Sequence, residues 1–178
     1  MTDYLVISAL GTDKPGIINR LSQKAVEHKC NILDTRMTVL GGEFALLMML
    51  SGETGAIAEL EPEIQSEADR LSLTLILKRT TPKAIQTHNI PYSVDVVALD
   101  NPGIVHEITK FFSDKMINIV EMETGTYAAA HTGTQMFSLE ITVNIPSNQS
   151  IAALKEEFLN FCDEKNLDAT IEPCRGNG

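Results

Sequence analysis

The chain is poor in aromatic and basic residues. Its 178 residues include no tryptophan, three tyrosines and six phenylalanines, and 14 basic residues stand against 24 acidic ones, for a net charge of −10. The densest basic stretch is Lys78-Arg79 with Lys83, which is no cluster for neutralising phosphates. RNA-binding sheets present aromatic side chains on their central strands, whereas Phe44 and Phe137 are isolated. Direct binding to nucleic acid is therefore not expected.

Cysteine is also scarce, and long apolar runs are absent. The three cysteines, Cys30, Cys162 and Cys174, form no CxxC pair and no zinc-ligand spacing, which is typical of reduced thiols in the cytoplasm. The first residues lack the pattern of a signal peptide, and the longest apolar run, 44–50, is too short to span a bilayer. We expect a cytoplasmic protein with no membrane segment, no metal and no cofactor.

Catalytic motifs are missing as well. The segment from Gly11 to Gly16 has the glycine spacing of a phosphate loop, but Ile17-Ile18 replaces the Lys-Ser/Thr that this loop needs. The chain has no nucleophile elbow, no GxGxxG and no HExxH, and its four histidines show no metal spacing. We expect no enzymatic activity. Small folds can catalyse reactions with few groups, so an enzyme stays open as an alternative that a metabolite-turnover screen would test.

What the chain does contain is an internal repeat. Asp13-Lys-Pro-Gly-Ile17 returns as Asp100-Asn-Pro-Gly-Ile104, at an offset of 87 residues (100 − 13). The same offset carries Asn31-Ile32 onto Asn118-Ile119. A repeat of this length predicts two copies of one small module.

Hydrophobic periodicity gives each copy the same order of elements. The first copy is expected to have strands at 4–9, 31–40, 43–50 and 73–77, with one helix from Ile17 and another from Ile57 to Leu71. Pro62 is expected to kink or restart the second helix, whose glutamates, Glu67 among them, are expected to face solvent. The second copy is expected to have strands at 92–99, 118–124, 136–144 and 167–171, with helices near 104–112 and 151–161 and extra hairpin residues within 125–133.

The order β-α-β-β-α-β predicts a four-stranded antiparallel sheet with two helices on one face. The expected fold is α+β, with two tandem ferredoxin-like units. Residues 1–80 form the first domain, 81–91 the linker and 92–178 the second domain.

The repeated Asp-x-Pro-Gly turns are the main candidate sites. Each precedes a helix, whose first N–H groups and positive dipole end suit a carboxylate, while Asp13 or Asp100 could accept bonds from an ammonium group. The structural alternative is that the aspartate caps the helix and Pro-Gly only makes the turn.

Asn31 and Asn118 begin the second strand of each copy, directly after a helix. They could reach the same ligand from the sheet edge. The alternative is that asparagine ends the helix, because it tolerates the left-handed conformation.

Together, the strand, the Asp-x-Pro-Gly-Ile turn, the amphipathic helix and the Asn-Ile strand resemble the ACT domain, a regulatory amino-acid-binding module. A tandem pair with the opening Leu5-Val-Ile-Ser-Ala-Leu-Gly-Thr-Asp-Lys-Pro-Gly-Ile-Ile is similar to the glycine cleavage system transcriptional repressor family. The resemblance implies the following ligand-binding residues: Asp13, Gly16, Ile17, Asn31, Asp100, Asn101, Gly103, Ile104 and Asn118. Lys14 stands where the second turn has Asn101, so the two sites need not bind equally.

The same resemblance implies a function. It implies a corepressor of the glycine cleavage system that responds to a small amino acid, glycine, and contacts a DNA-binding activator of the LysR type. A sensor of the same kind that regulates a metabolic enzyme is the alternative. ACT-like sheets often pair, so a homodimer is expected unless the two copies satisfy that need within one chain.

Overall fold

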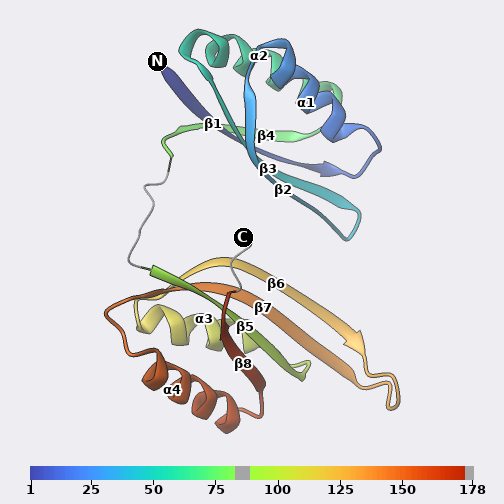
Figure 1. The fold of residues 1–178 in the computed structure, drawn as a ribbon. Helices are drawn as coiled ribbons and strands as arrows, with labels where there is room; N and C mark the ends of the chain where they lie inside the picture. The colour runs from blue at the N-terminus through green and yellow to red at the C-terminus, as the bar shows by residue number, and fades with distance from the viewer. Residues whose placement is uncertain (83–88, 175–178) are drawn as a thin grey trace. The chain divides into compact units, whose positions relative to one another are not determined.

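The computed structural model describes residues 1–82 and 89–174. The chain divides into two compact units, Met1–Ala84 and Ile85–Gly178, each with the order β-α-β-β-α-β (Figure 1). The first unit contains β1 (Thr2–Thr12), α1 (Ile17–Glu27), β2 (Asn31–Leu40), β3 (Glu43–Glu53), α2 (Thr54–Arg70) and β4 (Thr74–Thr80). The second contains β5 (Asn89–Leu99), α3 (Ile104–Asp114), β6 (Asn118–Ala128), β7 (Gln135–Pro146), α4 (Ile151–Glu164) and β8 (Asp168–Pro173).

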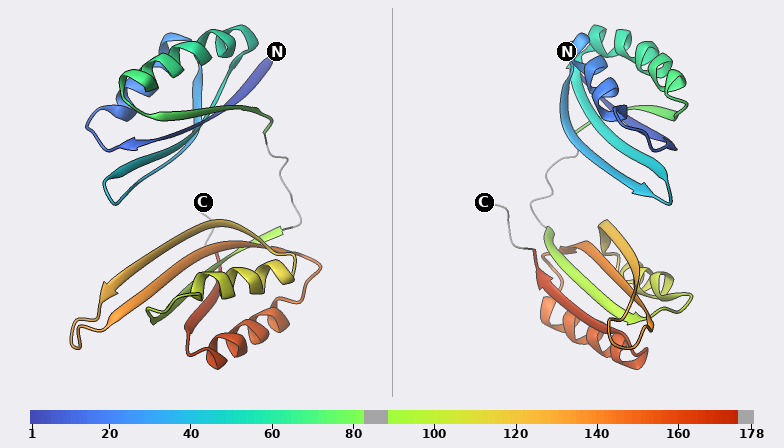
Figure 2. Two further views of the ribbon diagram at one scale, coloured as in Figure 1. Left: turned by 180° about the vertical axis from the view of Figure 1, so that it is seen from behind. Right: turned by 90° about the vertical axis from the view of Figure 1, so that its right-hand side faces the viewer.

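Each unit is one antiparallel sheet covered by two helices on one face (Figure 2). The strand order is β2-β3-β1-β4 in the first sheet and β6-β7-β5-β8 in the second. Alternate residues of the two central strands enter each core, as Leu5 and Ile7 do in the first unit and Val94 and Val96 in the second. Among the described residues, the other face of each sheet carries no helix of its own unit. The predicted α+β fold with two tandem ferredoxin-like units is confirmed.

The structure differs from the sequence-based expectation in three places. Helix α2 continues through Pro62 without restarting, because packing of its apolar stripe on the sheet outweighs the loss of one N–H donor. Glu67 was expected to face solvent, but only 4% of its surface is exposed. Strand β5 begins at Asn89, so 89–91 of the expected linker pair with β7, while 83–88 lie outside the described residues.

The edge strands β2 and β6 share an irregularity. The register of β2 on β3 shifts between Ile32 and Asp34, and that of β6 on β7 shifts between Ile119 and Glu121. The two bulges are 87 positions apart (119 − 32), the offset of the sequence repeat. A shared bulge means that the two copies agree in backbone detail as well as in topology.

No helix in the described ranges 1–82 and 89–174 is both long and apolar enough to cross a membrane.

Candidate functional site

The first Asp-x-Pro-Gly turn connects β1 to α1. The Asp13 N–H donates to the Gly42 carbonyl at 3.0 Å, which fastens the turn to the β2–β3 hairpin. Gly16 precedes the helix with φ 92°, a left-handed conformation that favours glycine. Within the described residues, no side chain caps this helix, so the prediction that Asp13 serves as the cap is wrong. The Asp13 side chain is instead exposed beside the turn.

A shallow hollow of about 240 Å³ lies at this turn. It is lined by the turn, the first residues of α1 and two apolar side chains of the hairpin: Asp13, Lys14, Gly16, Ile17, Ile18, Asn19, Met37 and Phe44. The first intrahelical bond of α1 runs from the Arg20 N–H to the Gly16 carbonyl at 3.0 Å. The N–H groups of the helix residues before Arg20 have no carbonyl acceptor within the helix. They are therefore available to an anion at the positive end of the helix dipole.

The second turn repeats the backbone of the first. The Asp100 N–H donates to the Gln135 carbonyl at 3.1 Å, and Gly103 has φ 100°. The Asn101 side chain turns back and donates to the Leu99 carbonyl at 3.4 Å. This turn therefore has a neutral amide, engaged with its own strand, at the position that Lys14 occupies in the first unit.

A hollow of the second unit lies away from its Asp-x-Pro-Gly turn. It measures about 650 Å³ and runs along α3 to the start of β6, lined by His106, Thr109, Lys110, Ser113, Met116, Ile117, Asn118 and Ile119. Asn118 is the only predicted site residue of the second unit that lines it. The turn residues Asp100, Asn101, Gly103 and Ile104 are not among the residues of this hollow.

The predicted asparagines lie at the far end of each sheet from the turns. Asn31 pairs with Ser51, which pairs with Tyr4, nine residues before Asp13 along the chain. At roughly 3.3 Å per residue, Asn31 and Asp13 are about 30 Å apart. The same spacing holds between Asn118 and Asp100 through the pairings of β7 and β5. One small amino acid cannot contact both groups within a single unit, so the expectation that they meet there is wrong.

The alternative explanation for the asparagines is also corrected. The left-handed residues that follow α1 and α3 are Lys29 (φ 55°) and Met116 (φ 57°), again 87 positions apart (116 − 29). The N–H of Cys30 closes the end of α1 by donating to the Ala25 carbonyl at 2.8 Å. Because these residues already end the helices, Asn31 and Asn118 are the first residues of their strands and not helix caps.

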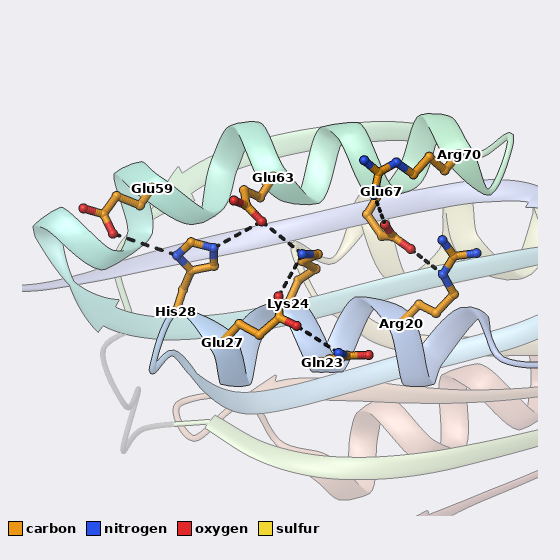
Figure 3. Close-up of polar contacts among 9 residues, drawn as sticks. All are labelled: Arg20, Gln23, Lys24, Glu27, His28, Glu59, Glu63, Glu67 and Arg70. Carbon is orange, nitrogen blue, oxygen red and sulfur yellow. Dashed lines mark hydrogen bonds and ion pairs between the residues drawn. The ribbon is translucent and has the colours of Figure 1, made fainter.

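A network of charged side chains holds α1 against α2 (Figure 3). The buried Glu67 carboxylate forms ion pairs with Arg20 and, at 3.4 Å, with Arg70. Lys24 contacts Glu63 at 3.0 Å, and this contact lowers the pKa of the Glu63 carboxyl. Sequence reasoning missed Glu67, although its position three residues after Ile64 lies on the apolar stripe of α2. The network fixes the helix whose N-terminus lines the first hollow.

Two features of the described residues concern metal binding and thiol reactivity. None of their His, Cys, Asp and Glu side chains form a group of three or more that could hold a metal. Burial and the nearby Asp163 raise the pKa of the Cys162 thiol to about 12, which keeps it protonated and unreactive at neutral pH.

Comparison with known proteins places this fold in a regulatory class. Residues 3–78 match the ACT domain family model. The glycine cleavage system transcriptional repressor of Escherichia coli (strain K12) is 33% identical over 170 residues, which cover 94% of this chain and 88% of the relative. The Shigella flexneri protein of the same name matches equally. The chain belongs to the glycine cleavage system transcriptional repressor family, and the recognition made from its repeated turns is confirmed.

Solved structures extend the likeness to the whole chain. A crystal structure provisionally assigned to the same repressor family has a TM-score of 0.76 at 29% identity and covers 99% of each chain. A protein of unknown function from Galdieria sulphuraria has a TM-score of 0.80 at 25% identity, over 98% of this chain and 100% of that one. The family relationship supports a regulatory role for both units together.

Proposed function

We propose that the chain is a glycine-responsive corepressor of the glycine cleavage system that acts by contact with a DNA-binding activator. The observation that supports ligand binding is the hollow at the first turn. It brings a carboxylate, an ammonium group and the N-terminus of α1 to one small space. A free amino acid carries the complementary pair of charges.

The pairing follows from charge. The ligand's ammonium group is bound by the Asp13 carboxylate, and its carboxylate is bound by Lys14 and the first N–H groups of α1. The hollow of about 240 Å³ is smaller than the roughly 300–1,000 Å³ of pockets for drug-sized ligands. Met37 and Phe44, together with Ile17 and Ile18, form its apolar part. A small amino acid fits these limits, and the relationship to the glycine cleavage system repressors favours glycine.

The two units then differ in role. The first turn binds the ligand, whereas the second turn has Asn101 in place of the lysine. The second unit carries a longer hairpin, in which β6 ends at Ala128 and β7 begins at Gln135, while Gly41 and Gly42 alone join β2 to β3. We assign contact with a LysR-type activator to this hairpin, because insertions in surface loops commonly carry binding functions. Such a protein works in the cytoplasm, without catalysis of its own.

Calorimetric titration tests the ligand proposal. Glycine is expected to give binding heat with the wild type, and Asp13→Asn or Lys14→Asn is expected to weaken binding by about tenfold or more, since each removes one charge-assisted contact. Asp100→Asn, the matched change in the second turn, is expected to leave binding unchanged. Serine and alanine serve as competitors with larger side chains. Absence of heat with every small amino acid, or equal loss in Asp13→Asn and Asp100→Asn, contradicts the proposal.

The partner proposal needs a separate measurement. The purified chain is expected to retain a LysR-type activator in a pull-down, and added glycine is expected to change the amount retained. A variant whose 129–134 turn is replaced by Gly-Gly, the turn of the first unit, is expected to lose the activator and keep the calorimetric response to glycine. If a metabolic enzyme is captured in place of the activator, the alternative sensor function is favoured.

A further inference from the structure

The face of the first sheet that points away from α1 and α2 is apolar at its centre. Successive residues of a strand lie on opposite faces, so Leu5 enters the core and its neighbour Val6 lies on the open face. The apolar residues of this face come from β1, β3 and β4: Val6, Leu10, Ala45, Leu47, Met49 and Ile76. Leu10, Leu47 and Ile76 are 52, 51 and 64% exposed. Within the described residues, none of the unit's helices covers them.

The corresponding face of the second sheet is acidic. Glu140 stands at the position of Leu47, since Glu140 pairs with Asp95 and Leu47 pairs with Ser8, 87 residues earlier (95 − 8). Carboxylates of all four strands lie on this face: Asp95, Glu121, Glu123, Glu140, Asp168 and Glu172. The two units share one fold, so the fold does not require an apolar open face. Exposed apolar patches of this kind mark surfaces that another molecule covers.

Opposite charges stand at the two margins of the apolar face. Asp34 on the edge strand β2 and Lys78 on the edge strand β4 belong to one row across the sheet, with Met49 and Val6 between them. The Asp34 side chain is 62% exposed. Lys78 is also exposed, and it has no carboxylate partner among the described residues. A carboxylate at one margin and an ammonium group at the other make the face complementary to itself.

A two-fold axis that runs along the strands brings these charges together. Sheets packed face to face lie about 10 Å apart, with strand directions within about 30° of each other. An axis between β3 and β1 reverses the strand order and keeps each row, so β2 of one copy lies over β4 of the other. Each Asp34 then faces Lys78 of the other copy, and the apolar centres meet. With an axis across the strands, Lys78 lies over β4 of the other copy, a strand without a carboxylate.

We propose that the open face of the first sheet packs against the same face of a second copy of this chain, with β2 of each copy over β4 of the other. The second copy is the occupant that the charges favour, because the two-fold contact provides Lys78 with Asp34 twice. The contact stacks two sheets and adds no strand to either. It is independent of the proposed ligand and activator, because it uses neither the first turn nor the long hairpin.

Sedimentation equilibrium of the full chain tests the apolar centre. Leu47→Glu and Ile76→Glu each place two carboxylates in the interface, one from each copy, and each is expected to weaken dimerisation by about a hundredfold or more. Val26→Glu is the matched control, because Val26 is 73% exposed on α1 of the same unit, and dimerisation is expected to stay unchanged. Far-UV circular dichroism verifies that each variant is folded. A wild type that stays monomeric at its solubility limit overturns the proposal, as does a dimer that both glutamate variants leave intact.

Charge exchange tests the two-fold arrangement. Asp34→Lys alone and Lys78→Asp alone turn two attractive pairs into two repulsive ones, and each is expected to weaken dimerisation by about tenfold at low salt. The double variant is expected to dimerise like the wild type. A mixture of the single variants is expected to form a heterodimer, because the lysines of one copy then face the aspartates of the other. Pairing of β2 edges would leave Lys78→Asp without effect, since Lys78 lies at the opposite edge, and that result refutes the stacked arrangement.

A zero-length cross-link provides an independent measurement. Within one copy, Asp34 and Lys78 are three strand spacings apart, about 14 Å, which is too far for a direct amide bond. A carbodiimide is therefore expected to join Lys78 to Asp34 only between copies, and mixing ¹⁵N-labelled with unlabelled chain identifies such peptides by mass spectrometry. Lys78→Arg is the matched control: it keeps the charge, so it is expected to dimerise and to lose the cross-link. A wild-type dimer without this cross-link overturns the proposed arrangement.

Discussion

Gly16 provides a test of why glycine stands in the turn before α1. Its φ of 92° lies in the left-handed region, and a Cβ built there meets no atom within 4 Å. Replacement by alanine therefore meets no steric obstacle, and its whole cost is backbone strain. For an L-residue in a left-handed conformation this cost is about 1–2 kcal/mol. Gly16→Asn is expected to lose less, because asparagine tolerates this conformation better.

Gly55 is the matched control. It lies in the first turn of α2 in the same unit, it also has open space around it, and it does not have a positive φ. Gly55→Ala is expected to stabilise the unit by about 0.5–1 kcal/mol, because glycine is a poor helix former. Both substitutions add one methyl group, but they are expected to change the free energy of unfolding in opposite directions. Together they separate backbone strain from the effect of the added methyl group.

The assay is thermal unfolding followed by far-UV circular dichroism, since the chain has no tryptophan to report by fluorescence. For a unit of this size, 1 kcal/mol corresponds to about 4–8 °C in Tm. Gly16→Ala is expected to lower the melting temperature of the first unit by at least that amount, with Gly55→Ala raising it. Equal shifts of the same sign in both variants would refute the explanation by backbone conformation.

Three further outcomes are expected. Glu140 stands opposite Glu123 in the β6–β7 register, so Glu140→Gln is expected to stabilise the second unit by roughly 0.5–1 kcal/mol at low salt and less at high salt; a loss of stability contradicts this. Phe158 is fully buried in the second core, so Phe158→Ala is expected to cost about 3–5 kcal/mol there and leave the transition of the first unit in place. Lys24 lowers the pKa of the Glu63 carboxyl, so this pair stabilises above the ordinary pKa of 4.5 and loses its contribution as pH falls through the lowered value. Lys24→Met is therefore expected to make the free energy of unfolding, measured with urea, fall less steeply as the pH is lowered. An unchanged dependence on pH counts against this explanation.

Local sequence patterns predicted the elements well, because each depends on near neighbours. The apolar spacing of Ile17, Leu21 and Ala25 gave the buried face of α1, and the alternation after Met136 gave a central strand. The turns were identifiable because Pro and Gly restrict backbone angles within a few residues. Errors arose where a distant surface decided the outcome. Glu67 is buried because Arg20 and Arg70 surround its carboxylate, and single-helix periodicity does not reveal a charge partner on another helix.

The sequence by itself determined that this protein is two copies of one βαββαβ module, with an Asp-x-Pro-Gly turn before the first helix of each. Only the tertiary structure decided which repeated residues meet. The antiparallel pairing of the strands places Asn31 at the opposite end of the sheet from Asp13. The aspartate and the asparagine of each repeat therefore lie at two separate positions in each unit. It also left β2 at an edge, where Asp34 and Arg36 are exposed. The physical reason is that sequence spacing fixes neighbours along a helix or strand, whereas strand order fixes neighbours across the sheet.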